Sequence, residues 1–282
     1  MSALSRLRTA VLLTALAALA ACTTTSTISG PVDGVPGPST PIATGVSKDR
    51  VTASDETDAT RRGRARLELA SAYFGEGQLE TALDEVKLAI NADSNSGQAY
   101  NLRGLIYSRL GDERLAEESF RRALQIDGND ADALHNFGWF QCQRQHYAES
   151  DALFAQALAV PRYRGASRSL LAQGVCQARG GKLVEAERTL LKSLEADATN
   201  PSTAVNLAEV LYRRADYDRA RFYIRRVNNQ GDMASAQTLW LGMRIEQRLD
   251  NRNGVEELGA RLRQRFPKSP EAGLYERRAF DE

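Results

Sequence analysis

Apolar side chains recur at helical spacing from Arg61 almost to the end of the sequence. Within stretches of about 14 residues they occupy positions i, i+3, i+4 and i+7, which is the pattern of a helix with one buried face. Residues that favour turns separate these stretches, as in Gly75-Glu76-Gly77, Gly111-Asp112 and Gly180-Gly181. The pattern predicts an all-α region built from paired amphipathic helices.

Small residues recur in these helices with a period of 34 positions, broken once by two extra residues. We expect each of them to lie where two paired helices approach closely, because a larger side chain would keep the helices apart. The first family is Ala70, Gly104, Gly138, Gly174, Ala208 and Gly242, and large apolar residues follow 16 positions later at Val86, Phe120, Phe154, Leu190 and Ile224. This period and this alternation of small and large residues resemble the tetratricopeptide repeat.

The predicted repeats form a superhelix of about six helix pairs, because one pair alone cannot bury its apolar face and stacked pairs can. A two-residue insertion near Val160–Tyr163 separates the third repeat from the fourth. The sixth repeat is degenerate, with Gly254 where alanine is expected, and together with the polar tail it fits a cap. The repeat domain spans 61–282, with repeats at 63–96, 97–130, 131–164, 167–200, 201–234 and 235–269.

The first 21 residues are typical of a secretory signal peptide. Arg6 and Arg8 precede an apolar stretch, Ala10 to Ala18, that is too short for a permanent membrane span. The stretch ends in Leu19-Ala20-Ala21-Cys22, which resembles the lipobox of bacterial lipoproteins. The resemblance implies cleavage before Cys22, acylation of Cys22, and anchoring in the outer membrane facing the periplasm, because Thr23 rather than Asp follows. An ordinary signal peptide with a chance cysteine is the alternative.

Residues 22–60 differ in composition from the repeats and are expected to form a flexible, disordered tether. Four of the eight prolines fall between Pro31 and Pro41, and no aromatic residue occurs before Tyr73. Such a segment buries too little apolar surface to offset the entropy of ordering. A coil of this length reaches on the order of 35 Å. The segment could also be a simple leader whose only role is spacing.

Charge and motifs argue against catalysis and against nucleic-acid binding. After loss of residues 1–21 the chain would carry 35 Lys+Arg and 36 Asp+Glu, and no basic tract stands out. His135 and His146 have no partners at metal-ligand spacing, and Gly180-Gly181-Lys182 lacks the remaining residues of a phosphate-binding loop. We therefore expect no enzyme activity, no cofactor, no metal site and no small-molecule substrate.

Cys142 and Cys176 are an even pair once Cys22 is acylated. They lie 34 residues apart in the first helices of adjacent repeats, and a secreted protein meets an oxidising compartment. A disulfide between them is the favoured interpretation. Two buried free thiols are the alternative.

The concave surface is the expected binding site. By resemblance to tetratricopeptide domains, positions 5, 9 and 12 of each first helix line a groove, which here is largely apolar and suits an amphipathic helix or apolar strand of a partner. Packing of the same side chains onto neighbouring repeats is the alternative. The predicted groove residues are Leu67, Phe74, Leu105, Trp139, Leu171, Val175 and Tyr212.

A closer resemblance is carried by several runs together with the lipobox and the number of repeats. Those runs include His135–Cys142, Gly174-Val175-Cys176, Leu207–Tyr212 and Leu239–Arg244. They resemble the type IV pilus biogenesis/stability lipoproteins of the PilW (PilF) family. The resemblance implies a non-enzymatic, pilotin-like adaptor that binds a subunit of the pilus secretin and promotes its assembly in the outer membrane. A general periplasmic scaffold for envelope or peptidoglycan-enzyme assembly is the alternative, and a lipid-anchored enzyme is a third reading for which no catalytic constellation is visible.

Overall fold

The computed structural model describes residues 57–280, so the predicted signal peptide, Cys22 and nearly all of the predicted tether lie outside the described residues. This part of the chain contains thirteen helices and no strand. The first helices of the six pairs are α1 Asp58–Gly75, α3 Gly97–Leu110, α5 Ala131–Gln143, α7 Ala166–Arg179, α9 Pro201–Arg213 and α11 Ala236–Arg248. The second helices are α2 Leu79–Ala92, α4 Glu113–Ile126, α6 Tyr147–Ala159, α8 Leu183–Ala196, α10 Tyr217–Asn228 and α12 Arg252–Arg265, and α13 Pro270–Glu276 follows.

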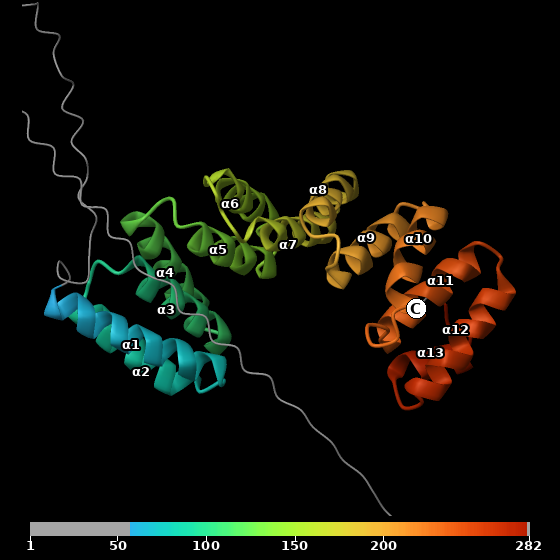
Figure 1. Cartoon of the computed structure of the whole chain (residues 1–282), viewed down its shortest axis with the longest axis horizontal. Helices are drawn as coiled ribbons and strands as arrows, with labels where there is room; N and C mark the ends of the chain where they lie inside the picture. The colour runs from blue at the N-terminus through green and yellow to red at the C-terminus, as the bar shows by residue number, and fades with distance from the viewer. Residues whose placement is uncertain (1–56, 281–282) are drawn as a thin grey trace, which may run out of the picture. The chain divides into compact units, whose positions relative to one another are not determined.

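The helices stack in chain order, as Figure 1 shows from α1 to α13. Each first helix packs on its own second helix, and each second helix packs on the first helix of the next pair. No helix contacts one more than two positions away along the chain within residues 57–280. This nearest-neighbour pattern is that of a solenoid. The predicted all-α tetratricopeptide-repeat superhelix is confirmed.

The small residues of the 34-residue period lie where paired helices approach closely, as the sequence predicts. A Cβ atom added at Gly104 would lie 2.7 Å from Cε1 of Phe120, and one added at Gly174 would lie 2.7 Å from Cγ of Leu190. Phe120 and Leu190 are completely buried. The small residue of the first helix therefore makes room for the large residue sixteen positions later in the second helix.

Polar caps determine where most of the first helices begin. The side chain of Ser96 accepts a hydrogen bond from Ala99 N at the start of α3, and Asp130 accepts from Ala133 N at the start of α5. Asn200 caps α9 just before Pro201, and Ser235 forms a capping box with Thr238 at α11. Each cap satisfies backbone N–H groups that have no partner inside the helix.

The first helices of the first and fourth repeats begin before the repeat starts that the sequence predicts, residues 63 and 167. Helix α1 begins at Asp58, so residues 58–60, for which the sequence predicts a flexible tether, are helical. The physical reason is a cap: Thr57 accepts a hydrogen bond from Thr60 N, and Asp58 pairs with Arg61 at 3.0 Å. Helix α7 begins at Ala166, one residue before the predicted start, behind Gly165, which provides no side-chain cap.

The last helix completes the sixth pair. Helix α13 contacts both α11 and α12, and its Tyr275 packs so closely on Gly259 that any side chain there would collide with it. Beyond α13 the Phe280 ring stacks on Trp240 of α11, with ring centroids 5.2 Å apart. The apolar end of the sixth repeat is thus covered.

Candidate functional site

The first helices of the repeats form one continuous face of the stack. The backbone of α1 approaches that of α3, α3 approaches α5, and the series continues to α11. Within residues 57–280 successive second helices lie farther apart and meet only through side chains, as Arg121 of α4 does with Glu149 of α6 and Arg219 of α10 with Glu187 of α8. Helices on the inner side of a curved stack lie closer together than those on the outer side. The odd-numbered helices α1 to α11 therefore line the inner face.

Six of the seven predicted groove residues are half-buried on these helices. The exception is Tyr212 of α9, which is only 9% exposed and packs in the hydrophobic core that α9 shares with the neighbouring helices. Trp139 packs against the disulfide cysteines and Phe154, and part of it stays at the surface. The half-buried set is Leu67, Phe74, Leu105, Trp139, Leu171 and Val175.

The three aromatic residues among the seven predicted groove residues are each covered by an arginine from the next first helix. The Arg109 guanidinium lies 4.8 Å from the centroid of the Phe74 ring, and the Arg179 guanidinium lies 5.3 Å from that of Trp139. Arg244 lies 4.7 Å from the Tyr212 ring. Cation–π contacts of this kind stabilise by about 0.5–2 kcal/mol. The inner face therefore presents rings flanked by guanidinium donors.

One arginine near the end of each first helix, from the second repeat to the sixth, reaches back to the preceding repeat. Arg144 pairs with Glu117 at 2.6 Å, and Arg213 donates to Ala178 O at 2.9 Å. Arg109 and Arg179 cover the rings described above, and Arg248 Nε approaches the Tyr212 hydroxyl at 3.5 Å. Sequence reasoning missed this series, although the spacing of the five arginines, 34 or 35 residues, would have revealed it.

Cys142 of α5 and Cys176 of α7 form a disulfide, with Cα atoms 5.7 Å apart. Both sulfur-bearing residues are buried, and Trp139 packs beside them. The bond joins the first helices of the third and fourth repeats covalently. It thereby spans the position where the two-residue insertion interrupts the 34-residue period.

His135 belongs to a buried polar cluster at the same junction. It is 8% exposed, its Nδ1 lies 2.8 Å from Ser169 Oγ, and Tyr163 of the insertion also contacts that oxygen at 3.0 Å. Burial and, to a lesser extent, the charge of nearby Arg168 lower the pKa of His135 to about 4, while Asp132 opposes the shift. Ser169 is completely buried, so this histidine–serine pair cannot reach a substrate.

His135 should make the fold sensitive to acid. Its pKa is about 4 in the folded chain and about 6.5 when unfolded, so the unfolded state binds the proton more tightly. The contribution of neutral His135 to the free energy of unfolding is fully present above pH 6.5. It is lost as the pH falls toward 4, and the loss between pH 7 and pH 5 is roughly 2 kcal/mol. Urea unfolding at both pH values should show this loss in the wild type and a smaller one in His135→Gln. An equal loss in both proteins would contradict the assignment, and His146→Gln, at an exposed position, is the matched control.

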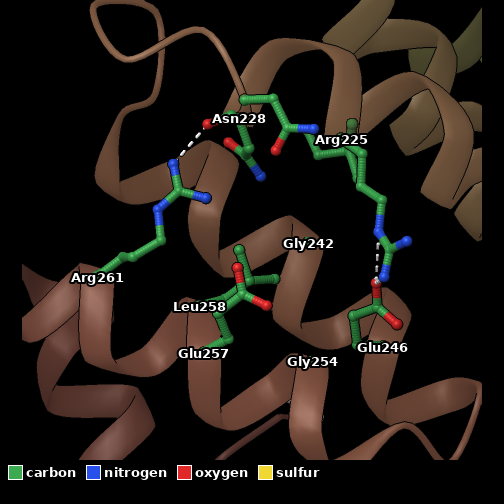
Figure 2. Close-up of a pocket in the computed structure, with 10 residues that line it drawn as sticks. Arg225, Asn228, Gly242, Glu246, Gly254, Glu257, Leu258 and Arg261 are labelled. Atoms are coloured by element: carbon green, nitrogen blue, oxygen red, sulfur yellow. Dashed lines mark hydrogen bonds and ion pairs between the residues drawn. The ribbon is translucent and has the colours of Figure 1, made fainter.

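A polar pocket of about 250 Å³ lies between α10, α11 and α12 (Figure 2). Its key group is Glu246, which is 2% exposed and accepts hydrogen bonds from Arg225 Nη2 at 2.8 Å and from Asn251 Nδ2 at 2.7 Å. A Cβ atom at Gly254 would lie 3.0 Å from the Glu246 carboxyl carbon. The glycine that departs from the repeat pattern therefore makes room for a buried carboxylate that locks the fifth repeat to the sixth.

Within residues 57–280 no group of three or more His, Cys, Asp and Glu side chains is arranged to hold a metal ion. In the same range no helix combines the length and the hydropathy that a membrane span requires.

Comparisons with known proteins agree with this architecture. The family model for the tetratricopeptide repeat matches residues 97–130, the span of the second predicted repeat. The chain is 28% identical over 227 residues to the type IV pilus assembly protein PilF of Pseudomonas aeruginosa, covering 78% of this chain and 90% of PilF. The crystal structure of PilW, described as a widely conserved type IV pilus biogenesis factor, is 31% identical with a TM-score of 0.70, and covers 74% of this chain and 96% of PilW.

The chain belongs to the PilW family. A solved structure of Pseudomonas aeruginosa PilF agrees, with a TM-score of 0.70, 25% identity, and coverage of 80% of this chain and all of that one. The resemblance that the sequence predicted is confirmed. Members of the PilW family with these names act in type IV pilus biogenesis and assembly, and the repeat scaffold that they share is typically a protein-binding one.

Proposed function

We propose that this protein is a pilotin-like adaptor of type IV pilus biogenesis, anchored through acylated Cys22 to the periplasmic side of the outer membrane. Its inner face binds a subunit of the pilus secretin and promotes assembly of the secretin. Membership of the PilW family supports the pilus role. The observation that carries the binding role is the inner face itself, with half-buried apolar side chains on the four consecutive first helices α1, α3, α5 and α7.

The chemistry of the inner face favours a mixed apolar and acidic partner segment. Phe74 and Trp139 offer aromatic surface, while Arg109 and Arg179 keep N–H donors beside each ring. An amphipathic helix or extended strand could place apolar side chains on the rings and carboxylates against the guanidinium groups. Tethering such a partner near the membrane raises its local concentration there.

Trp139→Ala should weaken capture of the secretin by roughly 2 kcal/mol, about thirtyfold, because aromatic anchors in a groove dominate binding energy. Surface pili should decrease as well. The measurement is binding of purified secretin subunits to wild-type and variant protein, with circular dichroism and thermal melting on the same samples. Phe222→Ala is the matched control, since Phe222 is 64% exposed on the second helix α10.

Two outcomes would count against this role for Trp139. Full secretin binding by the variant would show that the ring contributes no contact, and loss of native helicity would show that Trp139 is part of the core. Phe74→Ala, on the first repeat, provides an independent variant of the same face, and we expect the same direction of change.

Cys22→Ser should release the protein from the membrane, because the thioether anchor needs the sulfur atom. Two or more acyl chains hold a protein where a single chain binds only marginally, at about 0.8 kcal/mol per buried CH₂. Sucrose-gradient fractionation of cells that express the variant measures this directly. Retention of the variant in the outer-membrane fraction would refute the lipoprotein assignment.

A further inference from the structure

We propose that the pocket between α10, α11 and α12 binds a free α-amino acid with an aliphatic side chain. The pocket has a volume of about 250 Å³, and its charged lining residues are Arg225, Glu246, Glu257 and Arg261. Figure 2 shows Arg261 on one side of this space and the pair of Arg225 and Glu246 on the other. We call the space that these four residues and Asn228 line the sixth-repeat pocket.

The sixth-repeat pocket collects residues that depart from the repeat pattern of the chain itself. Asn228 takes a place that holds isoleucine or leucine in the earlier repeats, and Arg261 takes one that holds alanine, serine or valine. Glu246 takes a place that is uncharged in all of the earlier repeats. The equivalent residues are Ile90, Leu124, Leu158 and Leu194 for Asn228, Ala89, Ala123, Ala157, Ser193 and Val227 for Arg261, and Phe74, Ser108, Cys142, Ala178 and Tyr212 for Glu246. A fold breaks its own local rules mainly where function requires it, so the convergence of three such departures indicates a binding site.

Two of the four charged side chains have no counterion in the described part of the chain. Arg225 pairs with Glu246 at 2.8 Å. Within residues 57–280 Glu257 and Arg261 form no ion pair, and Arg261 donates a hydrogen bond to the backbone oxygen of Asn228. Glu257 lies four positions before Arg261 on α12, a spacing at which opposite charges on a helix commonly pair. The pocket therefore keeps one carboxylate and one guanidinium available for a ligand.

Asn228 adds an unmet hydrogen-bonding requirement. This residue is 2% exposed, and its Nδ2 donates to Thr238 O at 3.0 Å, while its Oδ1 has no partner within residues 57–280. Buried acceptors are normally paired, because an unpaired one loses its hydration without compensation. A ligand with an ammonium group brings the kind of donor that this wall of the pocket lacks.

The charges of the sixth-repeat pocket match a zwitterion. Its two arginines and two glutamates sum to zero, so a ligand with one carboxylate and one ammonium group fits better than an ion of either sign. The carboxylate of the ligand binds the Arg261 guanidinium, and its ammonium group binds the Glu257 carboxylate, through charge-assisted hydrogen bonds. Ile224 and Leu258 also line the pocket and provide a surface for an aliphatic side chain. The volume is below the roughly 300–1,000 Å³ of typical cofactor and drug sites, which suits a single amino acid.

This site goes beyond the proposed function, because it requires neither the secretin nor the rings of the first repeats. Phe74 and Trp139 lie on α1 and α5, whereas the sixth-repeat pocket is built on α10, α11 and α12. Substitutions at the two places can therefore be tested separately. Failure of secretin binding would not affect a result obtained with an amino acid.

The test is isothermal titration calorimetry of the full chain, purified in detergent, with L-leucine as the probe. Two analogues each lack one of the charged groups: leucinamide has no carboxylate, and isocaproate has no ammonium group. L-leucine should bind about tenfold more tightly than either analogue, because hydrogen bonds between charged groups are the strong ones.

Glu257→Gln and Arg261→Gln should each weaken binding of L-leucine by about tenfold, because each removes one charged partner of the ligand. The two variants should also separate the analogues. Arg261→Gln should leave the affinity for leucinamide unchanged, and Glu257→Gln should leave the affinity for isocaproate unchanged. Glu257 is exposed, so its variant should keep the fold, which circular dichroism checks. The matched controls are Glu256→Gln and Arg252→Gln, at exposed positions of α12 outside the pocket lining, and both should bind L-leucine as the wild type does.

Further ligands identify the source of the zwitterion. Glycine, L-alanine and D-leucine test the size and handedness of the amino acid, and phosphoethanolamine represents a zwitterionic lipid headgroup. Binding that increases from glycine to leucine would support the aliphatic wall of the pocket. Three results would overturn the proposal: no binding of any of these amino acids, undiminished binding of L-leucine by folded Glu257→Gln protein, or tighter binding of phosphoethanolamine than of every amino acid.

Discussion

Replacement of Cys142 and Cys176 by serine should lower the free energy of unfolding by about 3–4 kcal/mol. The bond closes a loop between residues 34 positions apart, and a cross-link of that span removes on the order of 3–4 kcal/mol of conformational entropy from the unfolded chain. The expected loss is a large part of the total stability of an ordinary domain, about 5–15 kcal/mol. Urea unfolding of wild-type and double-variant protein measures it.

Wild-type protein treated with a reductant is the control for this experiment. It should unfold at nearly the same urea concentration as the double variant, because both lack the covalent link. A thiol count in unreduced, denatured protein from the periplasm should find neither Cys142 nor Cys176 free. Two free thiols would disprove the disulfide, and an unchanged unfolding midpoint would show that the link does not restrain the unfolded chain.

Gly174→Leu should destabilise the protein by about 3 kcal/mol, the upper end of the usual cost of overpacking. A Cβ atom alone would lie 2.7 Å from Leu190 and 3.4 Å from the backbone oxygen of Ala186, so even alanine forces the pair α7 and α8 apart. The thermal midpoint should fall accordingly. Gly104→Leu should act in the same way against Phe120.

Gly138 provides the graded comparison. Its added Cβ would lie 3.3 Å from Phe154, a contact that requires only a small adjustment. We therefore expect Gly138→Ala to be tolerated and Gly138→Leu to cost about 1–3 kcal/mol. A thermal midpoint for Gly174→Ala that equals the wild-type value would contradict the close approach of α7 and α8.

The fold was predictable because the same small and large residues recur in every unit. Gly104 and Phe120 form one such pair, and the period that links them to Gly174 and Leu190 revealed both the helix pairs and their register. Cap residues such as Ser96 and Asp130, which directly precede a helix, would have marked the helix starts as well. Predicting these features requires only residues that are neighbours in the sequence or that lie one repeat apart.

The parts that could not be predicted depend on contacts outside the repeat pattern. Burial of His135 arises because Tyr163 of the insertion and Ser169 of the next repeat meet beside it. Burial of Glu246 depends on Arg225 from another repeat and on the space left by Gly254. The cover over the end of the sixth repeat depends on the chain after α13, whose Phe280 stacks on Trp240, and no periodicity indicates where a non-repeating tail packs.

The nearest-neighbour stacking of the helices implies that the two ends and the middle of the domain can open separately. The third and fourth repeats are joined by the disulfide, whereas the only described contacts between the first repeat and the rest of residues 57–280 are those of α1 and α2 with α3. In such a linear array, the end units exchange their amide hydrogens sooner than the centre, because fewer interfaces must break. Phe74 lies in the repeat that can open first, so a partner bound there would slow hydrogen exchange most in the very segment that is least protected without it.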